Sequence, residues 1–196
     1  MNMKAKRSAL GALMLLATLL LGGGRLRAQD LAVFDAHGPV KSIQYESGWL
    51  FFPSRELTYQ FDRRGRWLPA ANSDYVTIRD RRRRVVRHGY ADVSQDNTQF
   101  YYNRRGRVSW TFHVWPDDEG AFHVTNFYYD RRGDVSRMMQ RRYRGHRFAQ
   151  SEAHGVSKVS VRITKRDRHG NWTSRELFID GSSSPFVEKR TITYWK

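Results

Sequence analysis

The stretch from Phe61 to Trp67, FDRRGRW, decides the fold of this chain because its pattern recurs along the sequence. Full copies are YNRRGRV at 102–108, YDRRGDV at 129–135 and RDRHGNW at 166–172, and looser copies are FDAHGPV at 34–40 and RDRRRRV at 79–85. A full copy reads aromatic residue or Arg, Asp or Asn, two polar residues, Gly, one variable residue, and Val or Trp. Such self-similarity indicates one supersecondary unit that is used several times.

The residue types in this pattern are typical of a tight β-hairpin. Asp or Asn at the first turn position accepts a hydrogen bond from the backbone two residues later. Gly adopts the left-handed conformation that closes a type I turn with a G1 bulge. The pattern therefore predicts a hairpin with a three-residue loop. In the copy at 79–85, Arg83 stands in place of Gly, which either removes that copy or predicts a different turn there.

The hairpin geometry also predicts which side chains face each other across the two strands. The residues one step outside the turn become cross-strand neighbours, and pairs of aromatic and β-branched side chains contribute up to about 1 kcal/mol each. The predicted pairs are Phe61 with Trp67, Tyr102 with Val108, Tyr129 with Val135, and Phe34 with Val40.

Strand-like segments fill the chain between these turns, and helical periodicity is hard to find after residue 30. Strands are predicted at 40–46, 56–62, 74–80, 84–90, 97–103, 107–115, 121–129, 134–143, 156–166, 171–179 and 187–195. The predicted fold is all-β: a single antiparallel meander of roughly ten strands, built from Asx-x-x-Gly hairpins, with an open or rolled sheet.

The hairpin formed by 107–115 and 121–129 carries apolar side chains on both faces. Its turn is PDDEG at 116–120, and the expected register pairs Trp115 with His123 and His113 with Thr125. One face should hold Trp110, Phe112 and Val114 with Phe122 and Val124, and the other should hold Trp115, Phe127 and Tyr129. The sheet is therefore expected to be covered on both sides or to roll, so that its two ends bury opposite faces.

The motifs FYYNRRGRV and FYYDRRGDV resemble the tyrosine-aspartate (YD) repeats of rearrangement-hotspot and teneurin-type secreted proteins. The final stretch, from RDRHGNW to TITYW, is similar to the last repeat of small exported bacterial proteins of this kind. The resemblance covers most of residues 34–195 and implies a sheet of successive hairpins. Large members enclose a toxin in a shell of such hairpins, and this chain is far too short to do so.

The N-terminal segment has the layout of a secretory signal peptide rather than of a folded element. MNMKAKR at 1–7 carries three basic residues and no acid, and the apolar run that follows is short for a membrane span. We predict a signal-peptide helix in residues 1–28, with cleavage after Ala28 or near Gly24, and a single YD-repeat-like β domain over 29–196. An uncleaved N-terminal anchor is the alternative.

Composition excludes several classes of function. The 196 residues include no cysteine, so disulfide frameworks, cysteine nucleophiles, thiolate metal sites and a lipid-modified N-terminal cysteine are all excluded. Lys and Arg number 35 against 19 Asp and Glu, a formal charge of +16, and removal of 1–28 leaves thirty against nineteen, or +11. The expected location is the periplasm, the extracellular space or the cell surface.

Arginine pairs recur in the turns and are the candidate ligand-binding residues. Alternate hairpins of a meander place their tips at the same end, so the 103–107 and 130–134 turns should share an edge opposite the 117–121 turn. We expect polyanion binding at this rim through Arg63, Arg64, Arg104, Arg105, Arg131 and Arg132. The alternative is that these side chains are simply solvated and discourage aggregation of the sheet edge.

Two strand histidines provide an alternative of a different class. His113 and His123 should lie diagonally on one face, with Asp117, Asp118 and Glu119 nearby in sequence, as in an envelope hydrolase or accessory enzyme. No third metal ligand and no nucleophile motif accompany them. Nucleic-acid binding is disfavoured because no recognition motif is present and the chain carries an export signal.

The sequence therefore predicts a non-enzymatic, exported binding or structural module without a cofactor or metal. Its expected partner is an anionic envelope polysaccharide or an envelope protein, and no transmembrane span is expected in the mature chain.

Overall fold

The structure is a computed structural model that describes residues 29–46, 58–68, 70, 74–114, 121–144 and 153–196. The predicted signal-peptide helix within 1–28 and the predicted turn at 116–120 lie outside these residues.

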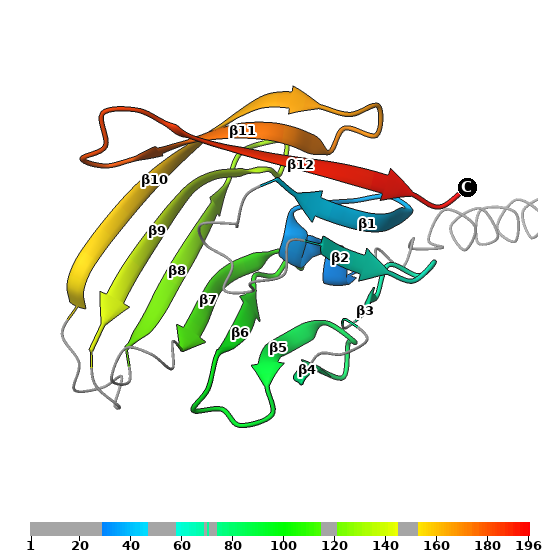
Figure 1. The fold of residues 1–196 in the computed structure, drawn as a ribbon, viewed down its shortest axis with the longest axis horizontal. Helices are drawn as coiled ribbons and strands as arrows, with labels where there is room; N and C mark the ends of the chain where they lie inside the picture. Colours follow the sequence, from blue (N-terminus) through cyan, green and yellow to red (C-terminus); the bar gives the residue numbers. More distant parts are fainter. Residues whose placement is uncertain (1–28, 47–57, 69, 71–73, 115–120, 145–152) are drawn as a thin grey trace, which may run out of the picture.

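The described residues form one short 3-10 helix, η1, and twelve strands (Figure 1). In chain order they are η1 (Gln29–Phe34), β1 (Val40–Tyr45), β2 (Thr58–Phe61), β3 (Trp67–Leu68), β4 (Tyr75–Arg79), β5 (Val85–Tyr90), β6 (Asn97–Tyr102), β7 (Val108–Val114), β8 (Phe122–Tyr129), β9 (Val135–Tyr143), β10 (Ala153–Arg166), β11 (Trp172–Ile179) and β12 (Phe186–Tyr194).

All twelve strands belong to one antiparallel sheet, in the order β3-β2-β1-β12-β11-β10-β9-β8-β7-β6-β5-β4. The prediction of an all-β antiparallel meander is confirmed, and each of the eleven predicted strand segments overlaps a described strand. β3 was missed because it is only two residues long, Trp67 and Leu68. The pairing of β1 with β12 brings the first and last strands together inside the sheet, so β3 and β4 become the two edges.

The sheet curls around η1, and its inner face forms the core (Figure 1). Phe34, at the end of η1, is fully buried, and its ring centroid lies 4.7 Å from that of Tyr59, 5.2 Å from Phe61 and 5.0 Å from Trp67. Edge-to-face and tilted ring pairs at such distances add to the hydrophobic gain of burial. The helix therefore fills one end of the rolled sheet as a plug.

The predicted hairpin pair of Phe34 with Val40 is wrong. Phe34 belongs to η1, and Asp35 takes a left-handed conformation with φ of 49° directly after it. The segment that follows binds to the last repeat instead. The His37 N–H donates to the Asn171 side-chain oxygen at 2.9 Å, and the Asn171 amide donates back to the His37 carbonyl at 2.8 Å. A long-range contact thus replaces the local turn that the FDAHGPV pattern predicts.

The other three predicted cross-strand pairs are confirmed. Phe61 faces Trp67, Tyr102 faces Val108, and Tyr129 faces Val135. The predicted face of Trp110, Phe112 and Val114 with Phe122 and Val124 is also confirmed by the register of β7 and β8.

Candidate polyanion-binding rim

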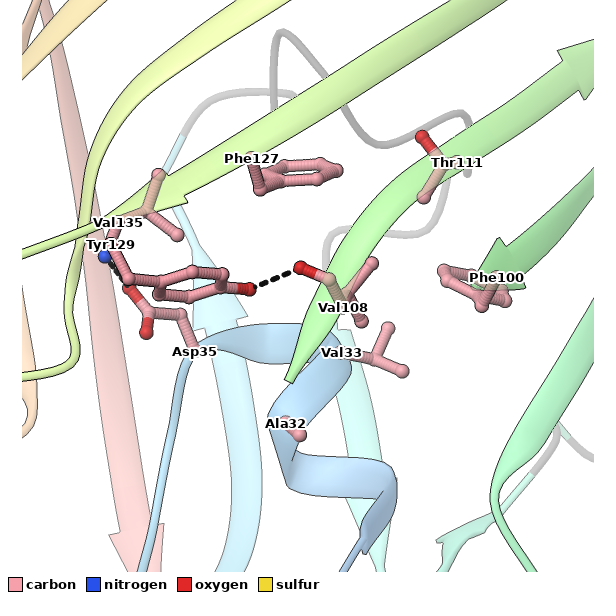
Figure 2. Close-up of a pocket in the computed structure, with 9 residues that line it drawn as sticks. All are labelled: Ala32, Val33, Asp35, Phe100, Val108, Thr111, Phe127, Tyr129 and Val135. Carbon is pink, nitrogen blue, oxygen red and sulfur yellow. Dashed lines mark hydrogen bonds between the residues drawn. The ribbon is translucent and has the colours of Figure 1, made fainter. Parts of the chain in front are cut away.

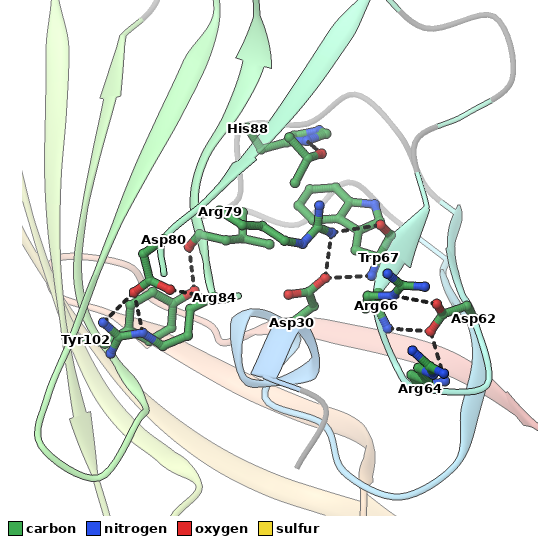
Figure 3. Close-up of polar contacts among 12 residues, drawn as sticks. Asp30, Asp62, Arg64, Arg66, Trp67, Arg79, Asp80, Arg84, His88 and Tyr102 are labelled. Atoms are coloured by element: carbon green, nitrogen blue, oxygen red, sulfur yellow. Dashed lines mark hydrogen bonds and ion pairs between the residues drawn. The ribbon is translucent and has the colours of Figure 1, made fainter. Parts of the chain in front are cut away.

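The turn between β2 and β3 shows how the repeated motif works (Figure 3). The Asp62 N–H donates to the Arg66 carbonyl at 3.0 Å, and the Gly65 N–H donates to the Asp62 carbonyl at 2.8 Å. The Asp62 carboxylate accepts the backbone N–H groups of Arg64 and Arg66 at 2.8 and 2.9 Å. Gly65 has φ of 72°, the left-handed conformation that the motif requires of this position.

Both backbone bonds and the side-chain bond to the fifth residue recur in four further turns, which begin at Asp80, Asn103, Asp130 and Asp167. The expectation of a missing or different turn at 79–85 is wrong, because Arg83 takes the glycine position with φ of 62°. The pattern of backbone contacts is therefore strong enough to hold an arginine in a conformation that costs a non-glycine residue about 1 kcal/mol or more.

All five turns lie at the same end of the rolled sheet. The turns join β2 to β3, β4 to β5, β6 to β7, β8 to β9 and β10 to β11. Neighbouring turns are therefore two strand spacings apart along the sheet, except where β1 and β12 lie between them. The predicted shared edge of the 103–107 and 130–134 turns is confirmed, and the 117–121 turn begins outside the described residues. We call the five turns, 62–66, 80–84, 103–107, 130–134 and 167–171, the rim.

The rim is strongly basic. Its five turns contain thirteen arginines against five aspartates. The second and third positions are exposed in every rim turn except at His169, and they include all six of the predicted ligand-binding residues: Arg63, Arg64, Arg104, Arg105, Arg131 and Arg132. Among the described residues, none of the six has an ion-pair partner. Arg63 alone has a ring contact, 5.4 Å from the centroid of Trp195.

The aspartates of the rim are already engaged within their own turns. Arg66 pairs with Asp62 at 2.7 Å and Arg84 with Asp80 at 2.6 Å. Partial desolvation acts to raise the pKa of both carboxyl groups, but the hydrogen bonds from Arg66 and Arg84 outweigh it and lower each pKa. The aspartate carboxylates are therefore engaged in hydrogen bonds within their own turns, and the arginines at the tips face outward.

Inside the rim, two tyrosines connect successive repeats. The Tyr102 hydroxyl donates to the Val85 carbonyl and the Tyr129 hydroxyl to the Val108 carbonyl, each at 2.6 Å. The guanidinium of Arg84 lies 4.7 Å from the Tyr102 ring centroid. Burial raises the pKa of both tyrosines, so both stay protonated and act as donors. We call each such bond, from the residue before the turn to the last residue of the preceding repeat, a staple.

The gap between the edge strands β3 and β4 carries a staple of different chemistry (Figure 3). Arg79 occupies the slot of the tyrosines, and its Nη2 donates to the Trp67 carbonyl at 3.1 Å and to the Asp30 carboxylate at 2.7 Å. Asp30 is 1% exposed and also accepts the Trp67 N–H at 2.8 Å. The helix η1 thus supplies the counter-charge that links the two edges, and we call this contact the seam.

The expected register of the two strand histidines is wrong. His113 faces His123 directly across β7 and β8, instead of diagonally. His113 is buried, and its Nδ1 lies 3.0 Å from the Asn97 carbonyl and 3.1 Å from the Thr98 hydroxyl. Burial lowers the pKa of His113 to about 3, so the ring is neutral at physiological pH.

The enzyme alternative needs acidic residues beside the histidine pair. Asp117, Asp118 and Glu119 lie outside the described residues. The Asp96 carboxylate from the β5–β6 turn lies close to His113, with 3.9 Å between Nε2 and Oδ1. Among the described residues, no group of three or more His, Asp or Glu side chains is placed to hold a metal ion.

The interior offers a substrate almost no room. A hollow between η1 and the strands β6 to β9 holds about 10 Å³, which fits one water molecule at most (Figure 2). Its lining is mainly apolar, and the Asp35 carboxylate that reaches it accepts the Val135 N–H at 3.4 Å. Desolvation raises the pKa of Asp35. This hollow, as the described residues line it, is too small for a ligand of appreciable size.

A buried charged cluster beside the plug was not anticipated from the sequence. The ring of Trp172 lies between two guanidinium groups, 4.0 Å from Arg175 and 3.6 Å from Arg190. Arg175 pairs with Glu188 at 2.5 Å, and both are essentially unexposed. Arg190 donates to the Phe34 carbonyl at 2.5 Å and so caps the C-terminal end of η1. These charges fasten the plug to the sheet and do not face solvent.

No family model, no curated protein and no solved structure matches this chain. None of the helices that the structure describes has the length and apolarity to cross a membrane.

Proposed function

We propose that this protein is an exported, non-enzymatic module of the cell envelope that binds a linear anionic polymer through the rim. The observation that carries the proposal is the gathering of five basic turns at one end of the sheet, with six exposed arginines that lack acidic partners among the described residues. A guanidinium group pairs with carboxylate, sulfate or phosphate in a fixed bidentate geometry.

The spacing of the turns favours a polymer over a compact partner. Neighbouring strands lie about 4.8 Å apart, so consecutive turns separated by two strands present their arginine pairs roughly 10 Å apart. Four turns, from 80–84 to 167–171, follow one another in this way along the sheet. A chain with charges at regular intervals matches such a row, and an anionic polysaccharide of the envelope is the partner we propose. An envelope protein with an acidic surface is the alternative occupant.

We also propose that the protein is exported and that its repeats are related to YD repeats. The signal-peptide pattern of residues 1–28 supports export to the periplasm or the cell surface. Cleavage after Ala28 would leave η1 intact, and Asp30 is needed at the seam. The recurrence of one turn and one tyrosine staple supports a YD-repeat assignment. N-terminal sequencing of the exported protein tests the first point: we expect Gln29 as the first residue, and an intact N-terminus in the membrane fraction would contradict it.

Charge reversal tests the rim directly. Replacing Arg104, Arg105, Arg131 and Arg132 with Glu removes four basic tips, and we expect about a tenfold or greater loss of affinity for long-chain polyphosphate at low salt. The matched control reverses four basic residues away from the rim: Arg137, Arg144, Lys158 and Lys189. Unchanged binding by the rim variant, or an equal loss in both variants, would reject the rim as the binding surface.

A further inference from the structure

The outer face of the sheet carries a shallow groove next to the rim. It encloses about 680 Å³ over the strands β4 to β7. Its lining includes Ile78, Arg84, Arg87, Gln99, Tyr101 and Trp110, and no acidic residue. Arg84 belongs both to this groove and to the 80–84 turn, so the groove opens directly onto the rim.

A β-bulge lies beside this groove. Tyr101 faces Trp110, whereas Tyr102 faces Val108, so Ser109 is the extra residue on β7, and the bulge places Val108 and Trp110 on opposite faces of the sheet. On β6, ordinary strand alternation directs Tyr102 inward to its staple and Tyr101 outward, where it is 38% exposed. The repeated FYY motif therefore serves two surfaces at once.

Tyr101 and Trp110 form a preorganised flat platform. Their ring centroids lie 3.6 Å apart and the rings are nearly parallel, at 3°. The Tyr101 hydroxyl donates to the Gln99 side-chain oxygen at 2.9 Å, which fixes the ring, and 38% of Tyr101 is exposed. Because the stack occupies one face of each ring, the other face of Tyr101 is available to a planar or ring-shaped ligand.

Arg87, the arginine beside this platform, has no polar partner for its side chain among the residues that the structure describes. The Nε of Arg87 is enclosed without a hydrogen-bond partner, and Arg87 has no ion pair among the described residues. The corresponding site one repeat later is closed. There Tyr128 faces Arg137, whose guanidinium lies 4.2 Å from the Tyr128 ring centroid and covers it. Only the earlier repeat leaves both an aromatic face and a cation for a ligand.

We propose that this groove binds one ring of an acidic polysaccharide, with the apolar face of the sugar against Tyr101 and its carboxylate or sulfate on Arg87. The remainder of the polymer then follows the rim, beginning at Arg84. This inference rests on the proposed function of the rim and adds a site that selects for sugar rings over charge alone. A peptide is disfavoured because Arg87, Tyr101 and Trp110 lie on β5, β6 and β7, whose backbone groups are paired on both sides, so a peptide could add a strand to this part of the sheet only at the edge of β4.

Two ligands separate the groove from the rim. An oligogalacturonate supplies both rings and carboxylates, whereas long-chain polyphosphate supplies charge without rings. We expect Tyr101→Ala to weaken oligogalacturonate binding by about tenfold in calorimetric titration and to leave polyphosphate binding unchanged. Tyr128→Ala is the matched control and should change neither. Arg87→Gln provides a second variant with the same expected pattern, should Tyr101→Ala not fold.

Each outcome has a distinct meaning. Unaltered oligogalacturonate binding by both groove variants would overturn the groove proposal and leave the rim untouched. Equal losses for the two ligands would also overturn it, because charge alone would then explain binding. A loss confined to a poly-glutamate peptide would assign the groove to a protein partner instead. Retained polyphosphate binding by the fourfold rim variant would reject the proposed function of the rim independently.

Discussion

The repeats at 102–108 and 129–135, which we call the regular repeats, differ from the seam in the side chain that precedes the turn. This position holds a neutral tyrosine in the regular repeats and a cationic arginine at the seam. In the regular repeats, Tyr102 and Tyr129 each donate one neutral hydrogen bond to a carbonyl of the preceding repeat. At the seam, Arg79 donates to the Trp67 carbonyl from the same position of its motif. The staple is therefore common to both regions, but at the seam it is made by a cation.

The difference follows from what surrounds each staple. Within the regular repeats, backbone ladders already join the strands, so the tyrosine hydroxyl has only to satisfy one buried carbonyl. At the seam, β3 and β4 are edge strands and no ladder joins them. A guanidinium reaches two acceptors at once, and Asp30 from η1 compensates its charge at 2.7 Å. Side-chain chemistry thus substitutes for backbone pairing where the sheet does not close.

Removing Asp30 should break the seam with the largest effect of any single change. Asp30→Ala leaves the Arg79 guanidinium and the Trp67 N–H without their acceptor. Loss of one partner of a buried ion pair costs about 3 kcal/mol or more of unfolding free energy. Urea denaturation followed by fluorescence measures it. The control Asp92→Ala removes an exposed turn carboxylate bonded to Ser94 and should cost far less, so similar losses in both variants would show that the seam is not special.

Acid should destabilise both regions through their buried histidines. Desolvation lowers the pKa of His113 in the regular repeats to about 3, and desolvation together with the nearby Arg79 lowers that of His88 at the seam to about 3. Both folded-state values lie below the unfolded value of about 6.5, so the stabilisation is complete above pH 6.5 and is lost as the pH falls toward 3. At pH 4.5 each histidine should cost about 2.5 kcal/mol.

Glutamine substitution measures the contribution of each histidine to the acid-induced loss of stability separately. Urea melts of His88→Gln and His113→Gln at pH 7 and pH 4.5 should each show a smaller acid loss than the parent chain. His88 packs on Trp67 with 3.8 Å between ring centroids, so its variant also reports on the seam. If neither substitution reduces the acid loss, groups other than these histidines govern it.

Local sequence was sufficient to predict the turns, most of the strands and the position of the basic tips. An Asx-x-x-Gly motif encodes its own hydrogen bonds, so the pairing of Tyr102 with Val108 follows without knowledge of the rest of the chain. The predicted binding arginines share one rim for the same reason, because alternation of a meander follows from counting strands.

Long-range contacts were beyond such an argument. The Phe34 segment carries a hairpin pattern but folds as a helix. The helix buries Leu31, Val33 and Phe34 in the core of the rolled sheet, and this burial outweighs the local turn pattern. The register of His113 with His123 was missed because the Asp117-x-x-Gly120 pattern predicts Trp115 opposite His123, whereas the observed register places Val114 opposite Phe122. The groove depends on the stacking of Tyr101 on Trp110 across two strands, and the sequence motif alone does not distinguish it from the later FYY repeat, where Arg137 stands opposite Tyr128.

The neutral staple should prove weaker than the charged one. Tyr102→Phe keeps the ring and removes the hydroxyl that donates to the Val85 carbonyl. Leaving that carbonyl unsatisfied in the core costs about 1–2 kcal/mol. Tyr101→Phe is the control, since its hydroxyl contacts only the part-exposed Gln99 and should cost under about 0.5 kcal/mol. A cost for Tyr102→Phe as large as that of Asp30→Ala would remove the distinction between the two kinds of staple.

The smallest effect concerns the turn next to the seam, where Arg83 holds the glycine position with φ of 62°. Arg83→Gly relieves a left-handed conformation worth about 1–2 kcal/mol but adds freedom to the unfolded chain worth about 0.5–1 kcal/mol. The net expectation is a gain under about 1 kcal/mol. Gly106→Arg makes the reverse change in the regular repeats, where φ is 75° and open space surrounds the new Cβ. It should lose a similar amount in urea melts, because only the backbone conformation changes in either case. If the Arg83 variant is instead destabilised, the arginine at this turn contributes a contact to the seam that outweighs its backbone strain.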